Sequence, residues 1–269
     1  DYDDIGPGFG HTASVLMPTV LGLGEQLHLS GKQAMEAFVV GFEVGARIGS
    51  NIGADHYAHG WHSTATNGAM GAAAAASRML GLDVEQTRCA LGLAASSAAG
   101  IRANFGYMAK PFHPGNSARA GIIAAMLAQK GMTANLDAVE GRFGYFDVYG
   151  NGQADLAGVS QNLGESFAIA DGIQIKPWPT CGGNHVAISL LEEMWAEHGV
   201  RADDIASVEV TISQNPADIA PNIADPKTGF QGKFSLWYNI AAWILDGQIN
   251  LNSFTDRRAR RPQLRDLMN

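Results

Sequence analysis

Histidine and lysine side chains gather in two segments that are otherwise rich in glycine, proline and aromatic residues. The first segment is Gly60-Trp-His62-Ser63, and the second is Lys110-Pro-Phe-His113-Pro. Histidine exchanges protons near neutral pH, and a lysine ammonium is a compact positive charge that suits a carboxylate. The two segments therefore predict acid/base chemistry on a small anionic substrate.

Two of the six lysines stand directly before a proline, within apolar or aromatic sequence. They are Lys110 and Lys176, the latter in Ile-Lys-Pro-Trp-Pro-Thr-Cys. Proline restricts the backbone around it, so these side chains can be aimed, whereas a solubilising lysine more often lies on a helix face. Each one alone fits equally well a lysine whose stem lies along apolar surface. Together they indicate two binding groups for carboxylates.

His62 directly precedes an alanine-rich segment that is expected to be a helix, and Ser63 or Thr64 could cap that helix. The N-terminus of a helix favours an anion and the neutral form of an imidazole, which suits a general base. His11 follows Asp1 across a glycine-rich loop, and a nearby carboxylate can fix the tautomer of an imidazole. A single loop histidine is more often structural, so the prediction depends on the whole group.

A metal centre is one alternative for the histidine-rich loop, since His56, His59 and His62 are spaced by three residues. No HExxH motif and no paired ligand spacing accompanies them, so we expect no metal. The chain has only Cys89 and Cys181, too few for an all-cysteine zinc site or an iron–sulfur cluster. We therefore expect no cofactor.

Composition limits the class of protein. The chain has 269 residues, of which 46% are hydrophobic and 16% charged, a globular composition. A net charge of -8 disfavours nucleic-acid binding, although a few local cations can still attract an anionic substrate. The longest apolar run, over 68–76, is too short to span a bilayer, and no signal-peptide pattern is present. We expect a cytoplasmic protein that binds neither nucleic acid nor membrane.

Helices are expected to position both segments. Apolar residues recur at three- and four-residue steps across 12–49, and Ser30 with Gln33 can form a capping box where a second helix begins. Helices are also predicted over 64–80, 83–99 and 116–131, with residues 101–115 as a loop. The 64–80 helix should be deeply buried, because its alanines and glycines let neighbouring helices approach closely.

The pattern changes near Asp171. A predicted helix over about 183–198 is followed by residues 206–213, Ala-Ser-Val-Glu-Val-Thr-Ile-Ser, which alternate as in a half-buried strand. Another helix is predicted over 234–245. The run Arg257-Arg-Ala-Arg-Arg is expected to be a solvated face. A smaller α+β domain should therefore follow the helical one.

Four segments, taken together and in this order, resemble the MmgE/PrpD family, which includes 2-methylcitrate dehydratase, cis-aconitate decarboxylase and iminodisuccinate epimerase. They are Asp1-Tyr-Asp-Asp with His11, Gly-Trp-His62-Ser-Thr, Met-Ala-Lys110-Pro-Phe-His-Pro-Gly-Asn and Ile-Lys176-Pro-Trp-Pro-Thr-Cys. The resemblance implies a mainly α fold: a large all-helical domain over 1–170, lacking its first helices, and an incomplete α+β lid over 171–269. It also implies an active site between the two domains and a homodimer.

The resemblance also assigns site residues. The catalytic positions match Asp1, His11, His62, Lys110 and Lys176, and the family's third histidine falls on Cys181, with His185 nearby. We expect the substrate to be bound by Ser63, His113, Cys181 and His185. In the decarboxylase branch a histidine stands at the position of Cys181 and a threonine at that of Ile5. Both differences argue against cis-aconitate decarboxylase.

The sequence therefore predicts a metal-independent lyase of the 2-methylcitrate dehydratase type, acting on a small polycarboxylate. The two lysines would hold carboxylates and stabilise developing enolate charge, while His62 and His11 carry the proton. An epimerase or isomerase acting on an iminodisuccinate-like substrate would use the same residues. A zinc hydrolase and a non-catalytic helical binding protein also stay open.

Overall fold

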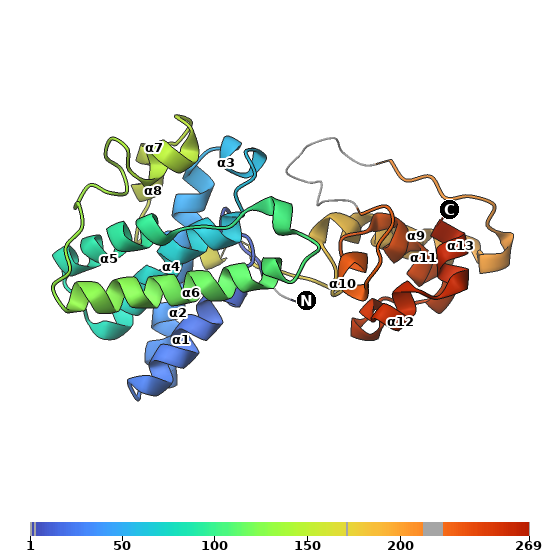
Figure 1. The fold of residues 1–269 in the computed structure, drawn as a ribbon, viewed down its shortest axis with the longest axis horizontal. Helices are drawn as coiled ribbons and strands as arrows, with labels where there is room; N and C mark the ends of the chain where they lie inside the picture. The colour runs from blue at the N-terminus through green and yellow to red at the C-terminus, as the bar shows by residue number, and fades with distance from the viewer. Residues whose placement is uncertain (1, 3, 171, 212–222, 269) are drawn as a thin grey trace. The chain divides into compact units, whose positions relative to one another are not determined.

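The chain is mainly helical in the computed structural model, which describes residues 2, 4–170, 172–211 and 223–268 (Figure 1). It divides into two compact units. The helical unit comprises Asp3–Ala103 and Pro111–Ile175, and the C-terminal unit comprises Asp1–Tyr2, Asn104–Lys110 and Lys176–Asn269. The mainly α fold expected from the sequence is confirmed. No helix among the described residues is long and apolar enough to cross a membrane.

Five long helices build most of the helical unit: α1 (Thr12–Gln26), α2 (Gly31–Asn51), α4 (Ser63–Leu80), α5 (Val84–Ser97) and α6 (Ala109–Gln129). The first two residues of α6, Ala109 and Lys110, group with the C-terminal unit. Three short helices and two 3-10 turns connect them: α3 (Asp55–Ala58), α7 (Tyr145–Gly150), α8 (Leu156–Ser160), Arg102–Asn104 and Ala168–Ala170. A short antiparallel pair, β1 (Asp4–Ile5) with β2 (Gln174–Ile175), was not expected.

Helix α4 is buried along almost its whole length, as its composition predicts. It packs against α1, α2 and α5. Its alanines and glycines leave the backbones of neighbouring helices close to its own, and Gly121 of α6 lies against Ala72 and Ala73. The helix ends at Gly81, which adopts the left-handed conformation (φ 66°) that glycine tolerates best.

The predicted helix starts are correct for α2 and wrong for α6. Ser30 caps α2, and with Gln33 it forms the predicted capping box. Helix α6 begins at Ala109, well before the predicted start at 116, so Lys110 and His113 lie in a helix and not in a loop. Pro111 is compatible with this start, because the N–H groups of a first helical turn have no partner within the helix.

The loop Gly6-Pro-Gly-Phe-Gly10 is a closed turn in which Gly6 and Gly10 exchange backbone hydrogen bonds. Phe9 is fully buried and fills a pocket lined by glycines of α2 and α4. A Cβ on Gly45 would lie 2.4 Å from its ring, and one on Gly71 would lie 2.9 Å from it. The buried ring therefore fixes the loop that leads into α1 and His11.

The C-terminal unit contains α9 (His185–His198), α10 (Gly229–Gly232), α11 (Leu236–Asp246), α12 (Asp256–Ala259) and α13 (Pro262–Met268), with 3-10 turns at Gly182–Asn184, Ala202–Asp204 and Leu251–Phe254. Both α9 and α13 pack on α11. Ile188, Tyr238 and Leu264 form the centre of the core, each less than 2% exposed. The helices predicted over 183–198 and 234–245 are confirmed.

The strand predicted over 206–213 is wrong for residues 206–211, which form no strand with any other described residue; residues 212 and 213 lie outside the described part of the chain. Alternation alone does not form a strand, because its N–H and C=O groups need a neighbouring strand to bind. Within the described residues of the C-terminal unit, the secondary structure is helical. The α+β character expected for this unit is therefore not seen there.

Candidate functional site

The rings of His62 and His113 meet inside the helical unit. His62 immediately precedes α4, as its N-cap residue, and His113 lies near the start of α6. Their Nδ1 atoms are 2.9 Å apart, a hydrogen-bond distance. Both residues are buried, 3% and 7% exposed. Two imidazoles separated by 51 residues in sequence thus form one buried pair.

Backbone and side-chain hydrogen bonds hold this histidine pair. The N–H of His62 donates to the carbonyl of Gly100 at 3.0 Å. The buried hydroxyl of Ser117 contacts two carbonyl oxygens, at 2.8 Å from Ala65 and 2.9 Å from His113, and so links α6 to α4. Each ring is therefore attached to backbone that is itself fixed, which limits how far the two Nδ1 atoms can separate.

His11 occupies the position before α1 that His62 occupies before α4. Its backbone N–H donates to the side-chain oxygen of Thr64, in the first turn of α4, at 3.1 Å. The two histidines thus stand at the N-termini of two helices that pack together. Asp1, the predicted partner of His11, lies outside the described residues.

The capping predicted for α4 is wrong. Helix α4 begins at Ser63, so His62 and not Ser63 or Thr64 is the N-cap residue, and it makes no side-chain capping bond. The Thr64 hydroxyl instead accepts the N–H of His11. Ser63 is half-buried in the first turn, directly after His62. Its predicted contact with the substrate stays a prediction.

His56 belongs to a separate buried network. Its Nδ1 lies 3.0 Å from the carbonyl oxygen of Tyr149, which can only accept, so Nδ1 carries the proton. Its Nε2 lies 2.8 Å from the hydroxyl of Thr66. Burial lowers the pKa of His56, more than the bond to Tyr149 raises it, so the neutral form is favoured. Both ring nitrogens serve structural bonds.

The metal alternative for this loop finds no support in the described residues, which bring together no three side chains able to hold a metal ion. His59 lies at the surface, with its Nδ1 2.8 Å from the carbonyl oxygen of Asp55. His56 is engaged as described, and His62 contacts His113. The three-residue spacing of these histidines therefore does not bring them to one point.

The two lysines belong to the C-terminal unit. The Lys110 ammonium lies over two aromatic rings, 5.2 Å from the centre of Phe105 and 5.3 Å from that of Phe234, which is cation–π distance. Lys176 is buried, with 8% exposure. Neither lysine therefore has the solvent-exposed side chain that a solubilising surface lysine would have. Such surroundings restrict an ammonium and raise the energy gained from an anion bound beside it.

Cys181 and His185 flank the turn that leads into α9. The backbone N–H of Cys181 donates to the carbonyl of Lys233, and Cys181 itself is half-buried. The ring of His185 packs edge-on against Trp178, with centroids 5.4 Å apart. Thr180 and Asn184 bond to each other and to Lys233, which fixes the turn. Both residues therefore lie on ordered backbone, and their contact with a substrate stays a prediction.

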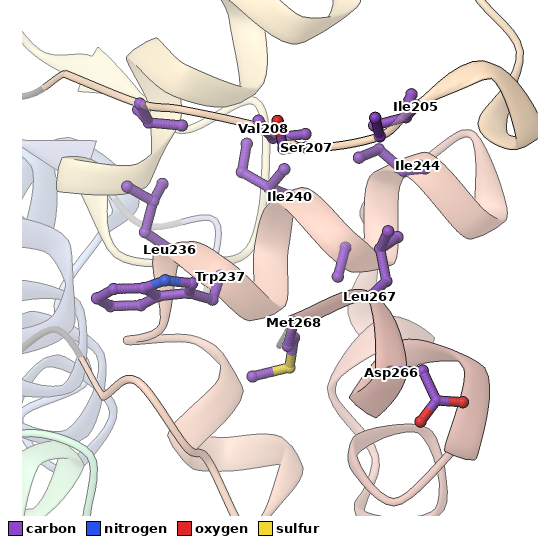
Figure 2. Close-up of a pocket in the computed structure, with 13 residues that line it drawn as sticks. Ile205, Ser207, Val208, Leu236, Trp237, Ile240, Ile244, Asp266, Leu267 and Met268 are labelled. Carbon is purple, nitrogen blue, oxygen red and sulfur yellow. The ribbon is translucent and has the colours of Figure 1, made fainter.

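A cavity of about 510 Å³ lies elsewhere in the C-terminal unit (Figure 2). Figure 2 shows Ile240 and Ile244 of α11 facing it, with Leu267 of α13 and Val208 of the segment before the undescribed residues. None of the predicted site residues that the structure describes lines it. Its walls are mainly apolar, and among the described residues that line it only Asp266 is acidic or basic, so it does not suit a polyanionic substrate.

Sequence reasoning missed the polar groups that hold the glycine-rich loop. Asn67 on α4 is buried; it donates to the carbonyl of Gly8 at 3.0 Å and accepts from the hydroxyl of Tyr145 at 2.9 Å. An asparagine within an alanine- and glycine-rich helix was the available signal, since a buried amide needs partners. The amide thus ties α4 both to α7 and to the loop before His11.

Comparison with known proteins identifies the family. The model of the MmgE/PrpD N-terminal domain matches residues 1–157, and that of the MmgE/PrpD C-terminal domain matches residues 178–269. Cis-aconitate decarboxylase of Homo sapiens is 29% identical over 277 residues, covering 100% of this chain and 57% of that protein. Cis-aconitate decarboxylase of Aspergillus terreus (strain NIH 2624 / FGSC A1156) is 33% identical over 279 residues, covering 96% and 57%.

This chain thus spans somewhat more than half the length of these curated relatives. Both relatives are named cis-aconitate decarboxylase, the activity against which Ile5 and Cys181 argue. The two differences therefore do not prevent the chain from being similar to decarboxylases over nearly its whole length. The two domain models match in sequence order and leave only the junction between them unmatched. The chain belongs to the MmgE/PrpD family.

Proposed function

We propose that this protein is a lyase that moves a proton beside a carboxylate group of a small polycarboxylate, with His62 as the base. The observation that carries the proposal is the buried pair of His62 and His113 at the N-terminus of α4. A histidine held in one orientation by a second ring is suited to repeated proton transfer. The relatives named above, which are lyases by name, support the same class.

The proposal assigns the carboxylates of the substrate to Lys110 and Lys176. Proton removal beside a carboxylate places negative charge on the enolate oxygens, and a fixed ammonium stabilises that charge by about 3 kcal/mol in a site without bulk water. The aromatic surroundings of Lys110 and the burial of Lys176 support this role. His11, before α1, is the proposed second proton carrier.

Two eliminations use this machinery. In dehydration, His62 takes a proton from carbon while hydroxide departs with a proton as water. In decarboxylation, the electrons of the broken C–C bond stay on carbon, which then takes a proton from an acid while CO₂ departs. The named relatives favour cis-aconitate as substrate, whereas Ile5 and Cys181 argue against cis-aconitate decarboxylase. An epimerase would return the proton to carbon without losing either group.

One set of assays separates these reactions. Purified protein at its full length is given cis-aconitate, 2-methylcitrate or iminodisuccinate. We measure CO₂ release from the first, absorbance of a new conjugated double bond from the second, and deuterium uptake from D₂O without loss of water for the third. We expect one of the two eliminations. Deuterium uptake alone would replace the lyase by an epimerase.

Substitutions then connect the reaction to the residues. His62→Phe should lower kcat by at least 100-fold, the lower end of the contribution of general acid/base catalysis. Lys176→Met should lower kcat/KM by a similar factor, since about 3 kcal/mol corresponds to more than 100-fold. Lys32→Met, on the exposed first turn of α2, is the matched lysine control and should leave turnover unchanged.

Turnover that survives the loss of Lys110, Lys176 and His62 would contradict the proposed site. Failure of all three acids to react or to bind would leave the non-catalytic helical binding protein as the better interpretation. The homodimer implied by the resemblance also stays a prediction, and light scattering of the purified protein measures it.

A further inference from the structure

The pairing of His62 with His113 limits the protonation states of both rings. An Nδ1–Nδ1 hydrogen bond of 2.9 Å needs a proton on one nitrogen and a lone pair on the other. A doubly protonated imidazole has no lone pair, so the two rings cannot both be cationic while this bond exists. The pair therefore takes up at most one proton beyond its neutral state.

The direction of the bond follows from the proposed role of His62. Its Nδ1 contacts His113, so the nitrogen that exchanges a proton with a substrate is Nε2. A base needs a lone pair on that nitrogen, which places the resting proton of His62 on Nδ1. His62 is then the donor, His113 is the acceptor at Nδ1, and the proton of His113 is on Nε2.

The acceptor matters most when His62 becomes charged. A cation at the N-terminus of α4 is disfavoured by the helix dipole, and burial of the ring disfavours it further. Once His62 takes a proton at Nε2, its Nδ1–H donates as part of an imidazolium, and such charge-assisted bonds are about twice as strong as neutral ones. By accepting this bond, His113 offsets part of the cost that the helix dipole and burial impose on His62 when it becomes positively charged.

We infer that His113 is a positioning residue for His62: by accepting its Nδ1–H, His113 fixes the tautomer and orientation of the base and stabilises the protonated ring. This inference rests on the proposed function for its catalytic part. It differs from the substrate contact that the sequence predicts for His113. The Ser117 hydroxyl supports it, since its contact with the carbonyl of Ala65 holds α6 against α4 one helical turn after His113.

The first experiment reads the tautomers without any substrate. Protein labelled with ¹⁵N in its histidines is studied by two-bond ¹H–¹⁵N NMR correlation, and the two rings are assigned by comparison with His62→Phe and His113→Phe. We expect a protonated Nδ1 on neutral His62 and a protonated Nε2 on neutral His113. A neutral His62 protonated at Nε2 would overturn the inference.

Two substitutions at 113 separate the hydrogen bond from the packing. Asn places its side-chain oxygen near the position of Nδ1 and keeps an acceptor, whereas Phe keeps the ring and removes the acceptor. His113→Phe should release His62 to a mixture of tautomers, and His113→Asn should retain the Nδ1–H form. Thermal denaturation shows whether both variants fold. His198→Phe, on the exposed end of α9, is the matched control.

Turnover of cis-aconitate and 2-methylcitrate provides the second measurement. His113→Phe should lower kcat by about 100-fold with little change in KM, and His113→Asn should restore at least a tenth of the activity. Equal loss in both variants would overturn the positioning role. An unchanged His62 tautomer in His113→Phe would overturn the inference while leaving the proposed lyase intact, whereas fixed tautomers without turnover would support the pairing and contradict the lyase.

Discussion

Gly41 on α2 and Gly71 on α4 approach so closely that a Cβ added to either residue would lie 2.7 Å from the carbonyl oxygen of the other. The ring of Phe9 occupies the space beside Gly71. Here the absence of side chains lets two long helices pack almost backbone to backbone. The close contact is reciprocal, so neither helix can accept even a methyl group without moving the other.

Substituting Gly71 by alanine should therefore destabilise the protein. We expect the free energy of unfolding to fall by about 1–3 kcal/mol, the usual cost of overpacking a core. Urea denaturation measures the change. Gly22→Ala is the matched control, because Gly22 is an exposed residue within α1 and a Cβ there meets no atom within 4 Å. It should raise stability by about 0.5–1 kcal/mol, and a Gly71 variant as stable as the control would contradict the packing.

Removing the hydroxyl of Tyr145 should weaken the link between α7 and α4. Burial raises the pKa of Tyr145, so the hydroxyl keeps its proton and donates to the side-chain oxygen of Asn67. Tyr145→Phe leaves that buried oxygen without this donor and should cost about 1–3 kcal/mol. The control is Tyr107→Phe, since Tyr107 is exposed. Equal unfolding free energies for the two variants would show that the bond contributes nothing.

Stability should depend on the protonation of His56. Because burial lowers its folded pKa below the ordinary 6.5, the unfolded chain binds this proton more readily. The contribution of His56 is therefore complete above about pH 6.5 and is lost as the pH falls from there toward the folded pKa, by at most about 1.4 kcal/mol per pH unit.

Comparison of variants isolates this contribution from other titrating groups. Unfolding free energies are measured between about pH 5 and 8 for the unmodified protein, His56→Gln and His59→Gln. The difference between unmodified protein and His56→Gln should shrink as the pH falls. The exposed His59 serves as control, and its variant should follow the unmodified protein. A difference for His56→Gln that is independent of pH would refute the linkage.

Asp246 at the end of α11 should stabilise the C-terminal unit through two arginines. Its carboxylate oxygens lie 2.7 Å from Arg258 and 2.7 Å from Arg261, and its side chain is 18% exposed. Asp246→Asn should cost about 2 kcal/mol, the size of hydrogen bonds to a charged group. Arg257→Gln is the surface control. Calorimetry measures the melting temperatures of both variants. Equal melting temperatures would show that Asp246 does not stabilise the C-terminal unit through these arginines.

Local signals in the sequence predicted most of the helices. The capping pair Ser30 and Gln33 and the stop at Gly81 act through neighbouring residues, so they could be read without the fold. The prediction of a strand over 206–211 was wrong, because a strand needs a neighbouring strand to bind and the local sequence does not specify one. The prediction that residues 257–261 form a solvated face was wrong in part. Arg258 and Arg261 each donate to the carboxylate of Asp246 on α11.

The site shows the same division between local and distant information. The sequence singled out His62 and His113 by their surroundings, yet it placed both in loops and gave no reason for their rings to meet. Their contact depends on the packing of α6 against α4, which brings together residues far apart in the chain. Asp1 lies outside the described residues, so its proposed partnership with His11 stays a prediction.

The burial of α4 has a consequence for protein engineering. Nearly every position along this helix is occupied by a small side chain in contact with a neighbouring helix, so libraries that randomise it will yield mostly unfolded variants. Diversity introduced at the half-buried Ser63 and at the exposed Ala99 and Ile101 should be better tolerated. Efforts to change the substrate of the proposed lyase should begin at these positions.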